Sequence, residues 1–170
     1  PLADLVKIDI RCILQEINLM FNIRVYGILI NDDRQVLVSD EKIRGGLYTK
    51  FPGGGLEFGE GTRDCLAREF MEEMQLKVNV GDHIYTTDYF QMSAFNPSHQ
   101  IISIYYFVHT EVPILLPTKT KAFDFSPEQI SDSNGESEVF RWVEWSKLSP
   151  DTVTLPIDKI VIKQLKSKNQ

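Results

Sequence analysis

Hydrophobic and polar residues alternate in short runs along most of the chain, which is the pattern of β-strands with one buried face. The runs predict strands at 24–30, 35–39, 47–51, 77–85, 86–92, 101–110 and 139–143. The polar residues 31–34 lie between the first two runs and predict the turn of a β-hairpin.

Two other segments repeat their apolar residues at every third or fourth position and therefore predict α-helices. The first begins at a Thr62 cap and runs to about Met74, with Leu66 and Phe70 on its apolar face. The second spans 156–166, starts at a proline and carries lysines toward its end. Strands on both sides of a central helix, with another helix at the end, predict an α/β fold.

The remaining segments are less regular. Residues 1–23 place apolar side chains at helical intervals and favour a helical N-terminal extension, although 8–14 could instead form a strand. Such an extension would pack on the domain or on a second subunit, which would make a homodimer. The segment 119–138 is polar, with a capped helical turn expected at 126–129. The length of 170 residues and the lack of a flexible linker suit a single domain, 1–170.

The predicted central helix carries three glutamates on one edge. At about 100° per residue, Glu69, Glu72 and Glu73 fall within one arc beside the apolar face. Like charges three or four positions apart destabilise a helix unless a counter-charge is present. Carboxylate oxygens suit Mg²⁺ or Mn²⁺, so the arc predicts a divalent-cation site, whereas the simpler alternative is a solvated acidic helix face.

Three glycines come shortly before that helix. Gly53, Gly54 and Gly55 allow the backbone to approach a ligand closely, although such a triplet could also be a simple turn. The loop 56–61 joins them to the helix N-terminus, where anions are favoured. Glycines and helix together predict a site for phosphate and metal.

These residues combine into one motif. Gly54 is followed after five residues by Glu60 and after seven more by Arg68 and Glu69, and the motif ends at Leu76. This segment resembles the Nudix box. The resemblance implies the Nudix fold, an α/β/α sandwich with a mixed β-sheet. It also implies hydrolysis of a nucleoside diphosphate linked to another moiety, with Mg²⁺ or Mn²⁺ as the cofactor.

The resemblance also implies roles for the residues of the box. The implied metal site consists of Glu72 and Glu73 as principal ligands, Glu69 as a further ligand or base, Glu60 as an accessory acid, and Gly54. Arg68 would orient the glutamates, so the implied catalytic set is Arg68 with Glu69, Glu72 and Glu73.

One position departs from the box, because Gln75 stands where the family has glycine. That glycine would follow the helix in a left-handed conformation, which costs another residue ~1 kcal/mol or more. We therefore expect a slightly altered helix end. All the carboxylates are retained, so the departure concerns local geometry and leaves the chemistry in place.

The implied mechanism is metal-assisted attack of water on a pyrophosphate phosphorus, with a carboxylate as general base. Within the family the base varies and often lies outside the box. The candidates are Glu69, which ranks first, and then Glu111, Glu136 and Glu138.

The rest of the substrate needs a binding surface outside the carboxylates. Gly53 and Gly55 are candidates for its phosphates. The candidates for a stacked base surround the loop 92–100 and are Tyr89, Phe90, Phe95 and His99. The alternative is that these aromatic side chains only pack against the core or its rim, in which case Arg24, Tyr26 and the segment 119–138 are the next places to look.

Charge and composition restrict the partners. A net charge of −6 without a basic stripe argues against binding of polymeric nucleic acid and leaves a small nucleotide-type substrate. Cys12 and Cys65 form no disulfide framework or metal motif. The absence of a long apolar run argues against a membrane span, so a cytoplasmic protein is expected.

Two other functions compete with a Mg²⁺-dependent pyrophosphohydrolase. One is a non-catalytic sensor or interaction domain that binds a nucleotide or metabolite, which would normally have an eroded box. The other is different chemistry on the same fold, such as an allylic diphosphate isomerase. That enzyme would need a catalytic cysteine outside the box, and neither Cys12 nor Cys65 is suitably placed.

Overall fold

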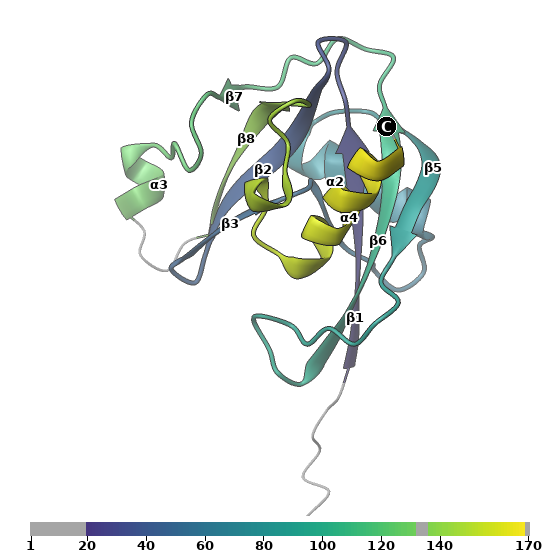
Figure 1. The fold of residues 1–170 in the computed structure, drawn as a ribbon. Helices are drawn as coiled ribbons and strands as arrows, with labels where there is room; N and C mark the ends of the chain where they lie inside the picture. The colour runs from purple at the N-terminus through teal and green to yellow at the C-terminus, as the bar shows by residue number, and fades with distance from the viewer. Residues whose placement is uncertain (1–19, 132–135, 169–170) are drawn as a thin grey trace, which may run out of the picture.

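The computed structural model describes residues 20–131 and 136–168, and these form two four-stranded sheets and three helices (Figure 1). Sheet A has the strand order β4-β1-β6-β5 and consists of β1 (Met20–Leu29), β4 (Gly53–Gly55), β5 (Asn79–Thr86) and β6 (His99–His109). Strand β1 runs parallel to β6, and the other pairs in this sheet are antiparallel. Sheet A is therefore mixed.

Sheet B has the strand order β3-β2-β8-β7 and consists of β2 (Gln35–Ile43), β3 (Gly46–Lys50), β7 (Thr118–Lys119) and β8 (Ser137–Glu144). Its parallel pair is β7 with β8, so this sheet is mixed too. The helices are α2 (Thr62–Met74), α3 (Pro127–Ser131) and α4 (Pro156–Lys168), with a 3-10 turn η1 (Pro150–Thr152) before α4. No helix in the described residues is long and apolar enough to span a membrane.

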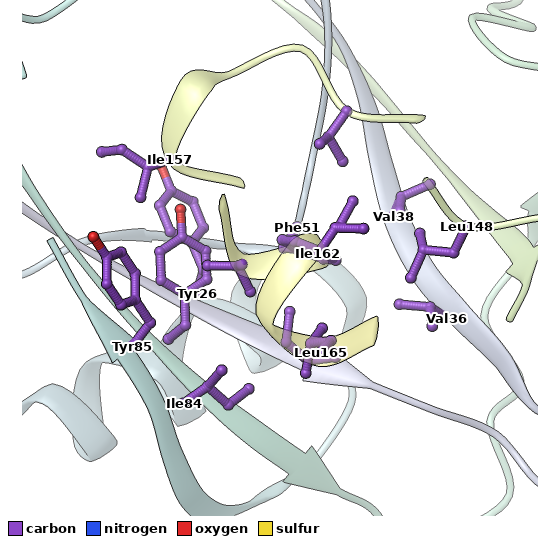
Figure 2. Close-up of a cluster of buried hydrophobic side chains, with 14 of the residues drawn as sticks. Tyr26, Val36, Val38, Phe51, Ile84, Tyr85, Leu148, Ile157, Ile162 and Leu165 are labelled. Carbon is purple, nitrogen blue, oxygen red and sulfur yellow. The ribbon is translucent and has the colours of Figure 1, made fainter. Parts of the chain in front are cut away.

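Sheet A lies between two helices because β1 is apolar on both faces. Tyr26 and Ile28 pack with α4 in the cluster that Figure 2 shows, whereas Val25 and Leu29 pack with α2 on the opposite face. Successive side chains of a strand point to opposite faces, so one apolar run serves both cores. The predicted α/β sandwich is confirmed, with two mixed sheets in place of one.

The predicted hairpin is only half correct. The turn is present, and the side-chain oxygen of Asn31 accepts the N–H of Gln35 at 2.8 Å. The two strands nevertheless enter different sheets and share only the isolated bridge between Ile30 and Val36. Each strand is apolar on both faces and pairs with long strands elsewhere, which a local turn signal does not reveal.

One further strand prediction was wrong. The segment 86–92 is not a strand beyond Thr86, although the isolated bridge between Met92 and Gln100 and the hydrogen bonds of Thr87 and Gln91 keep it beside β6. Phe90 and Met92 are exposed, so no buried face holds this segment in a sheet. The three glycines, for which a simple turn was one alternative, form the short strand β4 against β1.

The prediction of a helix over 1–23 is wrong for its last four residues. These belong to β1 and pair in parallel with the start of β6, from Met20 opposite His99 to Ile23 opposite Ile102. Residues 1–19 lie outside the described residues. The helical turn expected at 126–129 is confirmed as α3, because Ser126 and Gln129 bond each other's backbone N–H.

Both ends of α2 differ from expectation. Gly61 is the N-cap, its N–H donates to the Asp64 carboxylate at 3.3 Å, and Thr62 is the first helical residue. The Thr62 hydroxyl instead bonds the hydroxyl of Tyr106. At the other end Gln75 adopts the left-handed conformation, with φ 51° and ψ 32°, and donates to the carbonyl of Met71. The substitution of glycine by Gln75 thus leaves an ordinary left-handed helix end.

Candidate active site

A cavity of about 470 Å³ lies between the two sheets. Alternate residues of neighbouring strands line it, as the two-residue period of a strand requires. The lining residues on sheet A are Asn22, Arg24 and Tyr26 of β1 and Ile101, Ser103 and Tyr105 of β6. On sheet B they include Glu41, Ile43, Tyr48, Lys50, Ser137 and Glu138. The segments 91–95 and 155–157 complete the wall, and Glu73 reaches the cavity from α2.

Arg68 joins three glutamates of the box. Its Nε and Nη2 donate to the two carboxylate oxygens of Glu60, at 3.0 and 2.7 Å. Its Nη1 donates to Glu69 and to Glu72, each at 3.0 Å. The ion pair with Arg68 lowers the pKa of Glu60 to about 2, which keeps this carboxylate charged. The guanidinium therefore holds the box loop to α2.

A second group of charges lies inside the cavity, where Lys50 pairs with Glu41 at 2.8 Å. Glu138 stands opposite Glu41 in the ladder between β2 and β8 and accepts the Ser39 hydroxyl at 2.5 Å. Glu73 faces the same cavity, and its Oε2 is buried without a hydrogen-bond partner among the described residues. Three carboxylates thus accompany one lysine.

Burial raises the pKa values of two of these carboxylates, Glu73 and Glu138. Burial, followed by the negative charge of Glu138, raises the pKa of Glu73 to about 8. Burial likewise raises the pKa of Glu138 to about 7. Burial is the largest cause of both shifts, and the negative charges of neighbouring glutamates add to it.

The glycine strand brings the backbone up to these side chains. Gly53 has φ 135°, and a Cβ there would fall 2.1 Å from the carbonyl oxygen of Val25, so only glycine fits. Lys50 donates to the Gly53 carbonyl at 3.0 Å. A Cβ on Gly54 would fall 2.2 Å from the Glu69 carboxyl carbon. The strand therefore lies between Lys50, which lines the cavity, and Glu69 of α2.

The predicted metal ligands are not arranged around one point. No three carboxylate, histidine or cysteine side chains in the described part of the chain converge closely enough to hold a metal ion. Arg68 occupies Glu69 and Glu72, whereas Glu73 turns into the cavity. The donor chemistry still fits a hard divalent cation, because Glu73 keeps a buried oxygen without a partner and Glu138 lies in the same cavity.

The predicted substrate residues separate into two groups. Phe95 lines the cavity and contacts Tyr48 edge to face, with ring centroids 5.3 Å apart. Tyr89, Phe90 and His99 are absent from the residues that line this cavity. Phe90 is 70% exposed, and the His99 ring instead bonds the side chain of Asn96. These residues were grouped by sequence distance, but the loop turns them in different directions.

The cavity lining does include residues that the sequence analysis named as further candidates, namely Arg24, Tyr26, Glu136 and Glu138. The candidates for phosphate binding, Gly53 and Gly55, are not part of the lining. The remaining base candidate, Glu111, bonds Asn79 on the exposed end of β5 and is not part of the lining.

Sequence reasoning missed Glu41 and Lys50, both of which are buried. Glu41 continues β2 past the predicted end of that strand, in the charged run Asp40-Glu41-Lys42. The charged run at the end of a predicted strand could have indicated Glu41 as a site residue, because a charged side chain is buried only when it has a partner. The pairing of Glu41 with Lys50 depends on the hairpin register of β2 and β3, which the sequence pattern did not define.

Solved structures share this architecture. The ORF135 protein of E. coli is 15% identical, with 89% of this chain and 93% of that protein covered and a TM-score of 0.63. The MutT protein of Methanosarcina mazei is 16% identical over 88% and 96% of the two chains, with a TM-score of 0.61. A NUDIX hydrolase from Nitrosomonas europaea is 18% identical over 88% and 90%, with a TM-score of 0.55. At these identities the likeness concerns the fold.

The family model of the NUDIX domain matches residues 20–164. The chain therefore belongs to the Nudix family, as the segment from Gly54 to Leu76 predicted.

Proposed function

We propose that this protein is a Mg²⁺- or Mn²⁺-dependent hydrolase of a pyrophosphate bond in a nucleoside diphosphate linked to another moiety. One observation carries the proposal: Glu73 and Glu138 face one cavity between the sheets, and an oxygen of Glu73 is buried there without a partner in the described residues. A buried carboxylate oxygen without a hydrogen-bond partner is costly, so the arrangement favours a bound cation.

Glu73 would be a principal metal ligand, with Glu69 beside it on the same helix and Glu72 released from Arg68 when the metal binds. Bound Mg²⁺ or Mn²⁺ supplies charge neutralisation at the phosphate oxygens and lowers the pKa of a bound water. Arg68 keeps Glu60 and the box loop in place through two parallel hydrogen bonds.

Glu138 is the proposed general base. It lies in the cavity, it accepts the Ser39 hydroxyl, and burial raises its pKa to about 7, close to the value that suits proton transfer at neutral pH. Glu69 is less suited, because Arg68 already bonds its carboxylate. Glu138 would accept the proton of the attacking water while Lys50 limits the negative charge of the pocket.

The substrate moiety beyond the pyrophosphate would occupy the part of the cavity lined by Tyr48, Met92 and Phe95. Aromatic and apolar walls suit the stacking of a base. The box supplies no such surface on its own.

A release assay tests this proposal. The purified protein is incubated with nucleoside triphosphates, nucleotide sugars, ADP-ribose and dinucleoside polyphosphates, with Mg²⁺ and with a chelator. Metal-dependent release of phosphomonoester products by the wild type, lost in Glu73→Gln, is expected. Glu144→Gln is the matched control, since Glu144 is exposed and, among the residues that the structure describes, forms its ion pair with Lys147 alone. No release from any substrate would reject hydrolysis.

A sensor domain is the second candidate, and one observation favours it: Arg68 occupies Glu69 and Glu72, so the described ligands do not converge. Binding of a panel member with no release in Mg²⁺ or Mn²⁺ would support the sensor.

A further inference from the structure

The cavity is lined by a half-buried arginine, Arg24, that forms no ion pair with a carboxylate of the described residues. We infer that Arg24 binds a phosphate of the substrate, the one that remains on the nucleoside when the pyrophosphate is cleaved. This inference rests on the proposed function. Lys50 pairs with Glu41, Arg68 with three glutamates and Arg141 with Asp40. Arg24 makes no such pair within the described part of the chain, and its side chain bonds only the Tyr26 hydroxyl.

The geometry leaves the outer face of this guanidinium available. Nε donates to the Tyr26 hydroxyl at 3.2 Å, which holds the group across the edge of that ring. Nη1 and Nη2 have no protein acceptor in the described residues. Two parallel N–H groups match two oxygens of a phosphate, which is the geometry in which a guanidinium binds most strongly.

Small neighbours keep the side chain uncovered. In the ladders of sheet A, Arg24 stands between Gly55 of β4 and Ser103 of β6. Gly55 has no side chain, and a Cβ built there would lie 3.8 Å from Nη1 of Arg24. Larger residues at either position would cover the guanidinium. The strand pairing therefore leaves the positive charge of Arg24 accessible from the cavity.

The position of Arg24 relative to Glu73 also suits the binding of a pyrophosphate. Arg24 and Glu73 line the same cavity, with Arg24 on sheet A and Glu73 on α2. An anion is repelled by the carboxylates of Glu41, Glu73 and Glu138 and is attracted on the Arg24 side. The phosphate next to the nucleoside would therefore contact Arg24, while the other phosphate approaches the box glutamates.

Calorimetric titration tests the inference without requiring catalysis. The probes are the four common ribonucleoside 5′-monophosphates and the matching nucleosides, measured in chelator to exclude metal-bridged binding. For the monophosphate bound best, the wild type should show about tenfold or greater preference over its nucleoside, from one charge-assisted contact. Arg24→Gln should abolish that preference, and Arg24→Lys should reduce it, because lysine keeps the charge but loses the parallel donors.

Arg63→Gln is the matched control. Arg63 is an arginine of α2 that lies over the Tyr106 ring and donates to the carbonyls of Val80 and Gly81, away from the cavity lining. The Arg63→Gln variant should keep the wild-type preference for the monophosphate over its nucleoside. Equal preference in wild type, Arg24→Gln and Arg24→Lys, or no preference in the wild type, would overturn the inference. Should Arg24→Gln fail to fold, the comparison with Arg24→Lys decides the matter.

The release assay and this titration test the two proposals separately, because each can fail while the other succeeds. An Arg24-dependent phosphate preference in a protein that releases no product would leave the phosphate site in place and reject only hydrolysis. Hydrolysis that persists with no Arg24-dependent preference would reject only the phosphate site.

Discussion

The carboxyl group of Glu69 lies against the Cα of Gly54, so that a Cβ on Gly54 would fall 2.2 Å from its carboxyl carbon. Strand β4 and helix α2 therefore meet at a position where only a hydrogen fits. The same carboxylate accepts a hydrogen bond from Arg68 at 3.0 Å, so the Gly54 backbone, the Glu69 carboxylate and the Arg68 guanidinium are held in one arrangement.

Gly54→Ala should lower turnover by at least about tenfold, because the added methyl group displaces a box carboxylate. Stability should fall only by about 1 kcal/mol, since the displaced group is the end of a flexible side chain. Steady-state kinetics and urea unfolding measure the two effects. Gly61→Ala is the control: its Cβ would meet only an Asp64 oxygen, at 3.0 Å. Equal activity in Gly54→Ala and wild type would show that the position of Glu69 is unimportant.

Arg68→Lys should lower kcat and leave KM nearly unchanged. A lysine has one nitrogen and cannot bond Glu60, Glu69 and Glu72 together, so the site loses its geometry and no substrate contact is removed. Arg63→Lys on the same helix, where the side chain contacts backbone carbonyls and an aromatic ring, should behave as wild type. A large rise in KM at constant kcat would instead place Arg68 on the substrate.

Glu73→Gln should weaken binding of Mg²⁺ or Mn²⁺ by tenfold or more, on the order of 1.4 kcal/mol or above, because it removes the carboxylate with a free buried oxygen. Calorimetric titration with Mn²⁺ measures this directly. Saturating metal should also raise the Tm of the wild type more than that of the variant. Identical affinities for the wild type, Glu73→Gln and the exposed control Glu144→Gln would remove Glu73 from the metal site.

Phe95→Ala should change the ranking of substrates by base or sugar and leave metal affinity intact. Phe95 lines the cavity against Tyr48, and loss of one stacking contact is worth ~1–3 kcal/mol. Phe90→Ala is the matched control five residues away, since Phe90 is exposed and outside the lining. If the two variants give the same substrate ranking as the wild type, the specificity surface lies elsewhere in the cavity.

Asp158 should make the fold less stable at alkaline pH. It is fully buried and accepts the Tyr105 hydroxyl, and burial raises its pKa from 3.8 to about 7, against the opposing effects of Tyr105 and Lys50. A carboxyl with a raised pKa in the folded state contributes stability that is complete below the unfolded pKa and is lost as pH rises through about 7.

Between pH 5 and pH 8 the wild type should therefore lose on the order of a few kcal/mol more unfolding free energy than Asp158→Asn, which cannot titrate. Urea unfolding at both pH values gives the comparison. Glu73 and Glu138 titrate in both proteins, so their contribution cancels. Parallel pH dependence in wild type and variant would contradict the buried-carboxyl explanation.

The sequence alone determined the parts of the structure that repeat locally. Helix α2 was predicted almost to the residue, because Leu66, Phe70 and Met74 follow a helical period that packing on sheet A preserves. The motif from Gly54 to Leu76 identified the family, since a box of nearly contiguous residues does not need the fold to be recognised. Gln75 shows the limit of such reasoning: the backbone required a left-handed residue, and a non-glycine residue provided it.

Only the tertiary structure decided which charges meet. Glu41, Lys50 and Glu138 come from three strands, and their encounter depends on the register of β2 against β3 and β8. A one-residue shift of either ladder would turn these side chains to the other face, and no local pattern in the sequence specifies that register. Likewise, Phe95 lines the cavity and Phe90 does not, because the loop between β5 and β6 turns the two rings in different directions. Residue type and spacing defined the candidate chemistry, whereas strand pairing between distant segments defined the pocket in which it would occur.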